Sequence, residues 1–211
     1  MATINQLVSE LAHSLKQPDS VPVRKALKLE IIHARNALIR QSFEHHGYVD
    51  KVLQQKFKVE IEKEDDYVRT SNKVPKPVRL TNNNPFHSVT INDGGKLINI
   101  PYIKQDNVGF YNQLPGMKHI MSYDYINGYI YITNLTNENI ENIFIESVFE
   151  FPQILELDEE VGETSIDTID DDDEYLISED MVGNIKKLIL ETFNPQVVRD
   201  TNEPTPVSLV Q

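Results

Sequence analysis

The sequence predicts an α+β protein in which helical segments at both ends flank a β-rich middle. Near both ends of the chain, apolar residues recur at the spacing of an amphipathic helix, whereas the middle shows alternating polarity and clusters of turn residues. Of the 211 residues, 39% are hydrophobic, a content that supports a core but lies below the globular average. We therefore expect one structural domain whose helical parts pack together, followed by an extended tail.

Residues 1–56 are predicted to form a helical hairpin. Thr3 and Gln6 have the spacing of a capping box, and an apolar stripe follows them at helical periodicity. A second helix is expected to begin near Ser20 and to end at Gly47, because serine suits an N-cap and glycine suits the end of a helix.

Residues 57–154 are predicted to form antiparallel β structure. Alternating tyrosines surround the dipeptide Asn127-Gly128, and this combination predicts a tight Tyr-rich hairpin with a type I′ turn. The other expected strands are residues 57–61, 86–91 and 143–151.

An acidic loop or arm, residues 155–177, is expected to separate the β region from the last helix. It shows no hydrophobic periodicity and contains the run Asp170–Glu174. Ser178 suits the N-cap of a helix spanning residues 178–195. Residues 196–211 have little apolar content, and we expect them to form an extended tail.

Charge is distributed unevenly along the chain. The 20 Lys and Arg stand against 33 Asp and Glu, which gives a formal net charge of -13. Residues 1–80 hold 14 basic and 10 acidic side chains, whereas residues 81–211 hold 6 and 23. No Lys or Arg lies between Lys118 and Lys186. This excess of acid excludes a free nucleic-acid binder as the first hypothesis and favours solvated acid or contact with a basic neighbour.

The sequence offers no enzyme motif. The absence of cysteine excludes disulfides, Cys-ligated zinc and thiol catalysis, and the glycines form neither a phosphate-binding loop nor a nucleophile elbow. We predict no catalytic, cofactor-binding or metal-binding residue and no cofactor, and we leave divalent cation binding to Asp170–Glu174 open. An enzyme, the third hypothesis, requires His33, His45 and a carboxylate such as Glu44 or Asp50 at metal-ligand distance. With no signal peptide and no long apolar run, we expect a soluble, non-secreted protein without a membrane partner.

Four segments of the chain carry a resemblance to a known family of proteins. They are LEIIHARNALIRQSFEHHG at 29–47, YVRTSNKVPKPVRLTNNNPFHSV at 67–89, the predicted hairpin YDYINGYIYI at 123–132 and VVRDTNEPTPVSL at 197–209. Together they resemble virion structural proteins of crAss-like tailed bacteriophages, in particular the neck or head-to-tail connector proteins that form rings below the portal. The resemblance implies a homomeric, dodecameric ring in the virion neck or tail that is assembled in the host cytoplasm. It also implies the portal and other neck or tail proteins as partners, DNA passing through the lumen without sequence-specific binding, and no catalytic residues.

The leading hypothesis is therefore a non-enzymatic virion structural protein that forms a head-to-tail connector ring. The tail is expected to reach a neighbouring chain through Val197, Val198, Arg199, Pro204, Pro206, Val207 and Leu209. The acidic residues expected to line the lumen or to face a partner are Asp170, Asp171, Asp172, Asp173 and Glu174. The alternative is an intracellular acidic adaptor whose residues 156–180 bind a basic partner protein.

Overall fold

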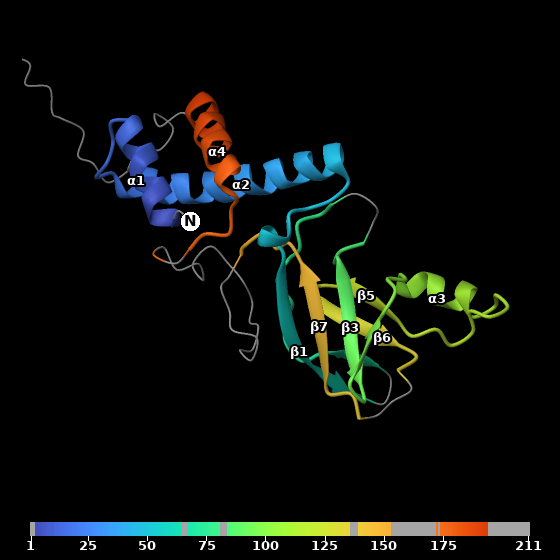
Figure 1. Ribbon diagram of the computed structural model, residues 1–211. Coiled ribbons are helices and arrows are strands. Elements are labelled where there is room, and N and C mark those ends of the chain that lie inside the picture. The colour runs from blue at the N-terminus through green and yellow to red at the C-terminus, as the bar shows by residue number, and fades with distance from the viewer. Residues whose placement is uncertain are drawn as a thin grey trace, which may run out of the picture.

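Helices form a layer at one end of a curled antiparallel sheet, so the predicted α+β class is confirmed (Figure 1). The structure, a computed structural model, describes residues 3–64, 67–80, 84–135, 139–152, 172 and 174–193. The expected tail, most of the acidic segment, and with them Asp170, Asp171 and Asp173 lie outside these residues.

The helical layer contains α1 (Ile4–Ser14), α2 (Val21–His46) and α4 (Glu179–Thr192). Their apolar faces meet in one cluster of buried side chains, and Figure 1 shows α1 and α4 crossing the long α2. Each fully buried Ile or Leu in such a cluster stabilises the fold by about 1.5–3 kcal/mol, so the cluster accounts for the association of segments that lie far apart in sequence.

The helix ends follow the predicted signals in part. The Thr3 hydroxyl accepts a hydrogen bond from the backbone N–H of Gln6, whose side chain accepts one from the N–H of Thr3, each at 3.2 Å. This capping box was predicted. Gly47 ends α2 with φ 75°, a left-handed conformation that glycine adopts without strain. Ser20 and Ser178 occupy the expected N-cap positions, but neither side chain makes a capping hydrogen bond within the described chain.

The sheet has the strand order β4-β3-β7-β1-β2-β6-β5, and every neighbouring pair is antiparallel. The bounds are β1 Gln55–Lys63, β2 Val68–Thr70, β3 Ser88–Asp93, β4 Lys96–Asn99, β5 Ser122–Ile126, β6 Tyr129–Thr133 and β7 Asn142–Ser147. A 3-10 turn, η1 (Lys51–Leu53), leads into β1. Residues 55–60 of β1 pair with β7 and residues 61–63 pair with β2, so this one strand connects the two halves of the sheet.

The curl of the sheet encloses a second apolar cluster. Figure 1 shows β1, β7 and β3 in front of β5 and β6, so the two halves of the sheet face each other. Inward-facing residues alternate along the strands, as the burial pattern of β7 shows, and they include Val59, Ile91, Ile132, Ile143 and Ile145. Side chains from both halves therefore form one core.

The Tyr-rich hairpin is confirmed as β5 and β6, with Ser122 paired with Thr133 and Ile126 paired with Tyr129. Asn127 and Gly128 form its two-residue loop and have φ values of 53° and 90°, as a type I′ turn requires. The expected strands at 57–61, 86–91 and 143–151 are present with shifted bounds, as β1, β3 and β7. The short strands β2 and β4 and a fourth helix, α3 (Gln105–Tyr111), were not predicted.

Candidate interaction surfaces

A buried arginine joins the helical layer to the sheet. Arg35 lies in the middle of α2, and none of its surface is exposed. Its Nε donates to the carbonyl oxygen of Leu176 at 2.7 Å, and its Nη1 donates to the carbonyl oxygen of Phe149 at 3.1 Å. Nη1 also donates to Oδ1 of Asn36 at 3.0 Å. Because Phe149 follows β7 and Leu176 precedes α4, one guanidinium connects three segments that are far apart in sequence.

A second set of contacts surrounds this junction. Asn36 Nδ2 donates to the carbonyl oxygen of Glu150 at 3.1 Å. The Glu150 carboxylate forms ion pairs with Lys76 at 2.9 Å and with Arg40 at 3.6 Å. Backbone carbonyls, a side-chain amide and charged side chains therefore all fix the residues that follow β7 next to α2. These contacts set the orientation of the helical layer on the sheet.

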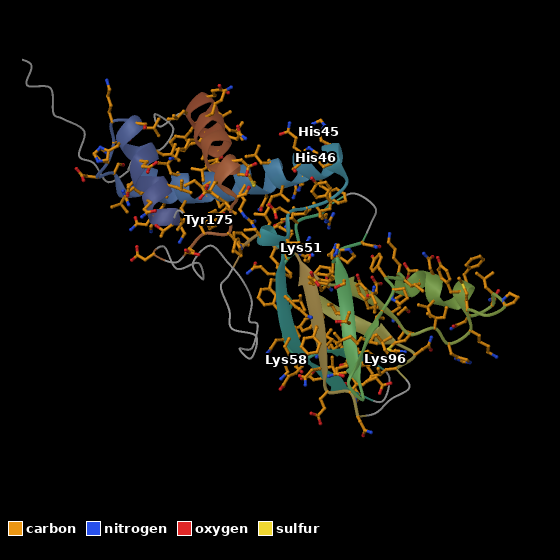
Figure 2. The ribbon with its side chains drawn as sticks, viewed as in Figure 1. His45, His46, Lys51, Lys58, Lys96 and Tyr175 are labelled. Carbon is orange, nitrogen blue, oxygen red and sulfur yellow. The ribbon has the colours of Figure 1, made fainter. Side chains whose placement is uncertain are left out.

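Burial shifts the pKa values of the two ionisable side chains at the junction, Arg35 and Tyr175. Tyr175 is 3% exposed, and the Cζ of Arg35 lies 5.8 Å from the centre of its ring (Tyr175 is labelled in Figure 2). Burial raises the pKa of Tyr175 to about 12, and the positive charge of Arg35 opposes this shift. Burial also lowers the pKa of Arg35. Arg35 Nη2 and the Tyr175 hydroxyl have no hydrogen-bond partner in the described chain.

The substitution Tyr175→Phe is expected to make the protein more resistant to alkali. Because the folded-state pKa of Tyr175 is raised above its ordinary value of 10, unfolding releases a proton and the parent loses stability as the pH rises from 10 to 12. Urea titrations at pH 9 and pH 12 measure this loss. The parent is expected to lose about 2 kcal/mol more than Tyr175→Phe across this window, whereas an equal loss in both proteins would contradict the shift.

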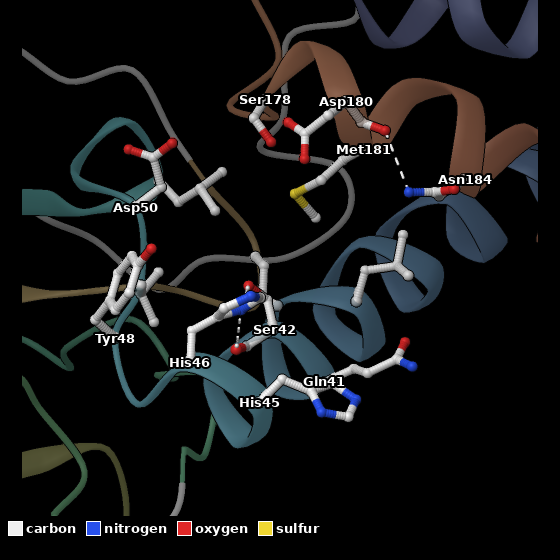
Figure 3. A pocket seen from close by; sticks show the side chains of 14 residues that line it. Gln41, Ser42, His45, His46, Tyr48, Asp50, Ser178, Asp180, Met181 and Asn184 are labelled. Atoms are coloured by element: carbon white, nitrogen blue, oxygen red, sulfur yellow. Dashed lines mark hydrogen bonds between the residues drawn. The ribbon is translucent and has the colours of Figure 1, made fainter.

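A hollow of about 360 Å³ lies where the end of α2, residues 48–53 and the start of α4 meet (Figure 3). In the last turn of α2, His46 Nδ1 lies 3.0 Å from the carbonyl oxygen of Ser42, so this nitrogen carries a proton. Figure 3 shows the His45 ring directed away from the His46 ring, and their centres are 6.5 Å apart. The two histidines therefore do not converge on a common ligand.

The arrangement required by the enzyme hypothesis is not found in the described chain. Among its residues, no group of three or more His, Cys, Asp or Glu side chains could hold a metal ion. His45 and Asp50 both line the hollow at the end of α2, but His33 does not. These side chains form no metal site there.

The two described members of the acidic run lie at the start of α1. Asp172 accepts a hydrogen bond from Asn5 Nδ2 at 3.1 Å, and Glu174 forms an antiparallel bridge with Thr3. Asn5 Oδ1 in turn accepts a hydrogen bond from Arg24 Nη2 at 2.8 Å. An acidic side chain near a helix N-terminus is stabilised by the positive end of the helix dipole, which accounts for this placement. All tail residues predicted to bind a partner lie outside the described chain.

Residues 104–121 project from the sheet and include helix α3, and we call them the α3 projection. This feature was not predicted from the sequence. The N–H of Gln105 donates to Oδ2 of Asp124 at 2.8 Å, and Asn134 Nδ2 donates to the carbonyl oxygen of Ile120 at 3.1 Å, so both ends are tied to the hairpin. Helix α3 has no buried residue, and Phe110 and Met117 are 62% and 39% exposed. Figure 1 shows α3 beside the sheet and away from the helical layer. The projection thus exposes apolar side chains on the surface of the described chain.

Residues 6–206 match a crAss-type family that is described as phage tail ring protein 2. The chain belongs to this family. No curated protein matches the chain.

As a member of this family, the ring protein is a structural phage tail protein and a virion component. A ring requires oligomeric assembly, and other phage tail proteins are its partners. The predicted crAss-like phage origin is thereby confirmed. In the described ranges, the ring protein has no helix with the length and apolar character needed to span a membrane.

Proposed function

We propose that the ring protein forms a homo-oligomeric head-to-tail connector in the virion neck, stacked between the portal and the tail, with twelve copies around the path of the DNA. Family membership across residues 6–206 supports a ring. The observation that carries self-assembly is the α3 projection, because it exposes Phe110 on a helix that contributes nothing to the core of its own chain.

A seven-residue helix without packing is unstable on its own in water. A ring built from one kind of chain needs a head-to-tail contact between two different surfaces of neighbouring copies. The α3 projection, placed against the adjacent copy, would bury Phe110 and Met117 and would stabilise α3. This contact explains why Phe110 and Met117 are exposed on the surface of a single subunit.

The charge of the chain supports passage of DNA without tight binding. A net charge of -13 repels phosphate, and twelve copies would multiply that repulsion around the lumen. A duplex surrounded by acidic side chains is not held at fixed positions and can slide. The acidic residues Asp170–Glu174 remain the proposed contributors, either to this lining or to a contact with a partner.

Mass photometry and negative-stain microscopy of the purified protein, alone and mixed with portal, test the connector. We expect closed rings of twelve copies that bind coaxially to portal particles. A protein that stays monomeric at all concentrations and never joins portal would contradict a ring, and rings of another symmetry would contradict the proposed copy number.

The substitution Phe110→Ser is expected to lower the fraction of protein in rings at least about tenfold, because one large apolar side chain is lost from every interface. Val21→Ser is the matched control, since Val21 is also 62% exposed but lies at the start of α2. Mass photometry at equal concentrations compares the two variants with the parent. Equal ring fractions for Phe110→Ser and Val21→Ser would contradict a contact through the α3 projection.

A further inference from the structure

A basic groove lies on the sheet beside the base of the α3 projection. It has a volume of about 550 Å³, and all the charged side chains that line it are cationic, namely Lys76, Arg79 and Lys104. Tyr102 and Tyr125 also line it. Lys104 is at the same time the N-cap residue of α3, so the groove and the projection are continuous on the surface.

The charge of this groove is only partly compensated. Lys76 forms its ion pair with Glu150, which is shared with Arg40. No acidic side chain of the described chain forms an ion pair with Arg79 or Lys104. Two exposed cations in a concave surface therefore attract an anionic partner.

One tyrosine of the groove is suited to the same partner. The Tyr102 side chain is hydrogen-bonded to Asp124, whereas Tyr125 presents a hydroxyl that is protonated at neutral pH and whose pKa is raised by burial. A protonated tyrosine hydroxyl donates a hydrogen bond to a carboxylate. The groove thus combines two cations that form no ion pair in the described chain with the hydroxyl donor of Tyr125.

The chain itself carries an anionic segment of matching charge. Residues 153–171 contain eight Asp or Glu and no Lys or Arg. This segment runs between the described residues Pro152 and Asp172, and Asp172 is hydrogen-bonded to Asn5 of its own subunit. A loop of 19 residues that is held at both ends can project by at most about half of its extended length, or roughly 30 Å, which is enough to reach a neighbouring subunit.

We propose that the basic groove binds the acidic segment 153–171 of the adjacent copy in the ring. This inference rests on the proposed ring, because a head-to-tail interface needs two different and complementary surfaces on each chain. The groove would add a polar contact to the apolar contact made by the α3 projection, and the two surfaces meet at Lys104. Contacts of this kind steer association and weaken with salt, so ring assembly is expected to slow as the ionic strength rises.

Site-specific cross-linking tests whether the groove of one copy binds the acidic segment of the next. Because the parent contains no cysteine, only the introduced cysteines can react. Chains with Lys104→Cys are mixed with chains that carry Glu159→Cys, and a short bismaleimide is added after assembly. We expect a covalent dimer of the two chains. Lys96→Cys replaces Lys104→Cys in the control, because Lys96, the first residue of β4, does not line the groove (Figure 2), and no dimer is expected.

The outcomes separate this inference from the proposed function. Rings without the covalent dimer would overturn the groove contact and leave the connector intact. A cross-link found only within one chain that carries both substitutions would show that the segment binds its own groove, which also overturns the inference. A protein that forms no ring would instead contradict the proposed function.

Charge reversal gives a second, independent measurement. The double variant Arg79→Glu/Lys104→Glu is expected to weaken binding of a labelled synthetic peptide of residues 153–171 at least about tenfold, measured by fluorescence anisotropy. Lys96→Glu is expected to leave peptide binding unchanged. A groove that binds a DNA duplex more tightly than the peptide at physiological salt would overturn the proposal.

Discussion

Replacing Arg35 with alanine is expected to lower the free energy of unfolding by about 3 kcal/mol. The substitution leaves three acceptors without their donor: the partly buried carbonyl oxygen of Leu176, and the buried carbonyl oxygen of Phe149 and side-chain oxygen of Asn36. It also opens a cavity between α2 and the sheet. Removing a fully buried cation relieves some desolvation, but this gain is smaller than the cost of three unsatisfied acceptors and a cavity.

Arg40→Ala is the matched control for this prediction. Arg40 lies on the same helix, but its side chain is 46% exposed and its ion pair with Glu150 is 3.6 Å long. Exposed pairs contribute about 1 kcal/mol or less, so a small loss is expected. Urea unfolding of both variants at neutral pH gives the comparison. If Arg35→Ala costs no more than Arg40→Ala, the junction does not hold the helical layer on the sheet.

Local signals predicted the elements with strong periodicity or a fixed turn chemistry. The capping box at Thr3 and the hairpin at Asn127-Gly128 were found because each depends on residues that are neighbours in sequence. The strand order was not predicted, because β1 must pair with β7, a strand more than 80 residues later. Such long-range pairing leaves no local pattern.

The junction was missed although its signal is visible in the sequence. Arg35 lies four residues after Ile31 and four before Ile39, both of which are buried, so it occupies the apolar stripe of α2. A charged residue on a buried stripe indicates a polar contact inside the fold. The stripe alone does not identify that contact, because the acceptors are backbone carbonyls of distant segments.

The α3 projection and the basic groove were not predicted from the sequence. The α3 helix is too short for an apolar stripe, and Phe110 is exposed, so hydrophobic periodicity gives no signal there. The basic groove brings together residues 76–79, 104 and 125, which only the curl of the sheet places side by side. The acidic segment was visible from charge alone, whereas its proposed binding surface required the structure.

Phe149→Ala is expected to lower the free energy of unfolding by about 3–5 kcal/mol. Phe149 has no exposed surface, and its ring centre lies 4.9 Å from that of Phe57 and 6.4 Å from that of Phe86. The substitution removes these ring contacts and opens a cavity inside the curled sheet. Phe110→Ala makes the same chemical change at a residue that is 62% exposed, and it is expected to alter the stability of the monomer by less than about 0.5 kcal/mol.

Phe149→Ala is expected to lower the stability of the monomer, whereas Phe110→Ala is expected to lower the fraction of protein in rings. Assembly stabilises the folded chain by mass action, so unfolding is measured at a concentration where the protein is monomeric. Phe149→Ala then shifts the urea midpoint strongly, because its side chain belongs to the core. Phe110→Ala is expected to leave the midpoint unchanged and to lower the ring fraction, because its side chain lies in the proposed interface. A stable Phe149→Ala protein, or a Phe110→Ala monomer destabilised by as much as 2 kcal/mol, would contradict this division between core and interface.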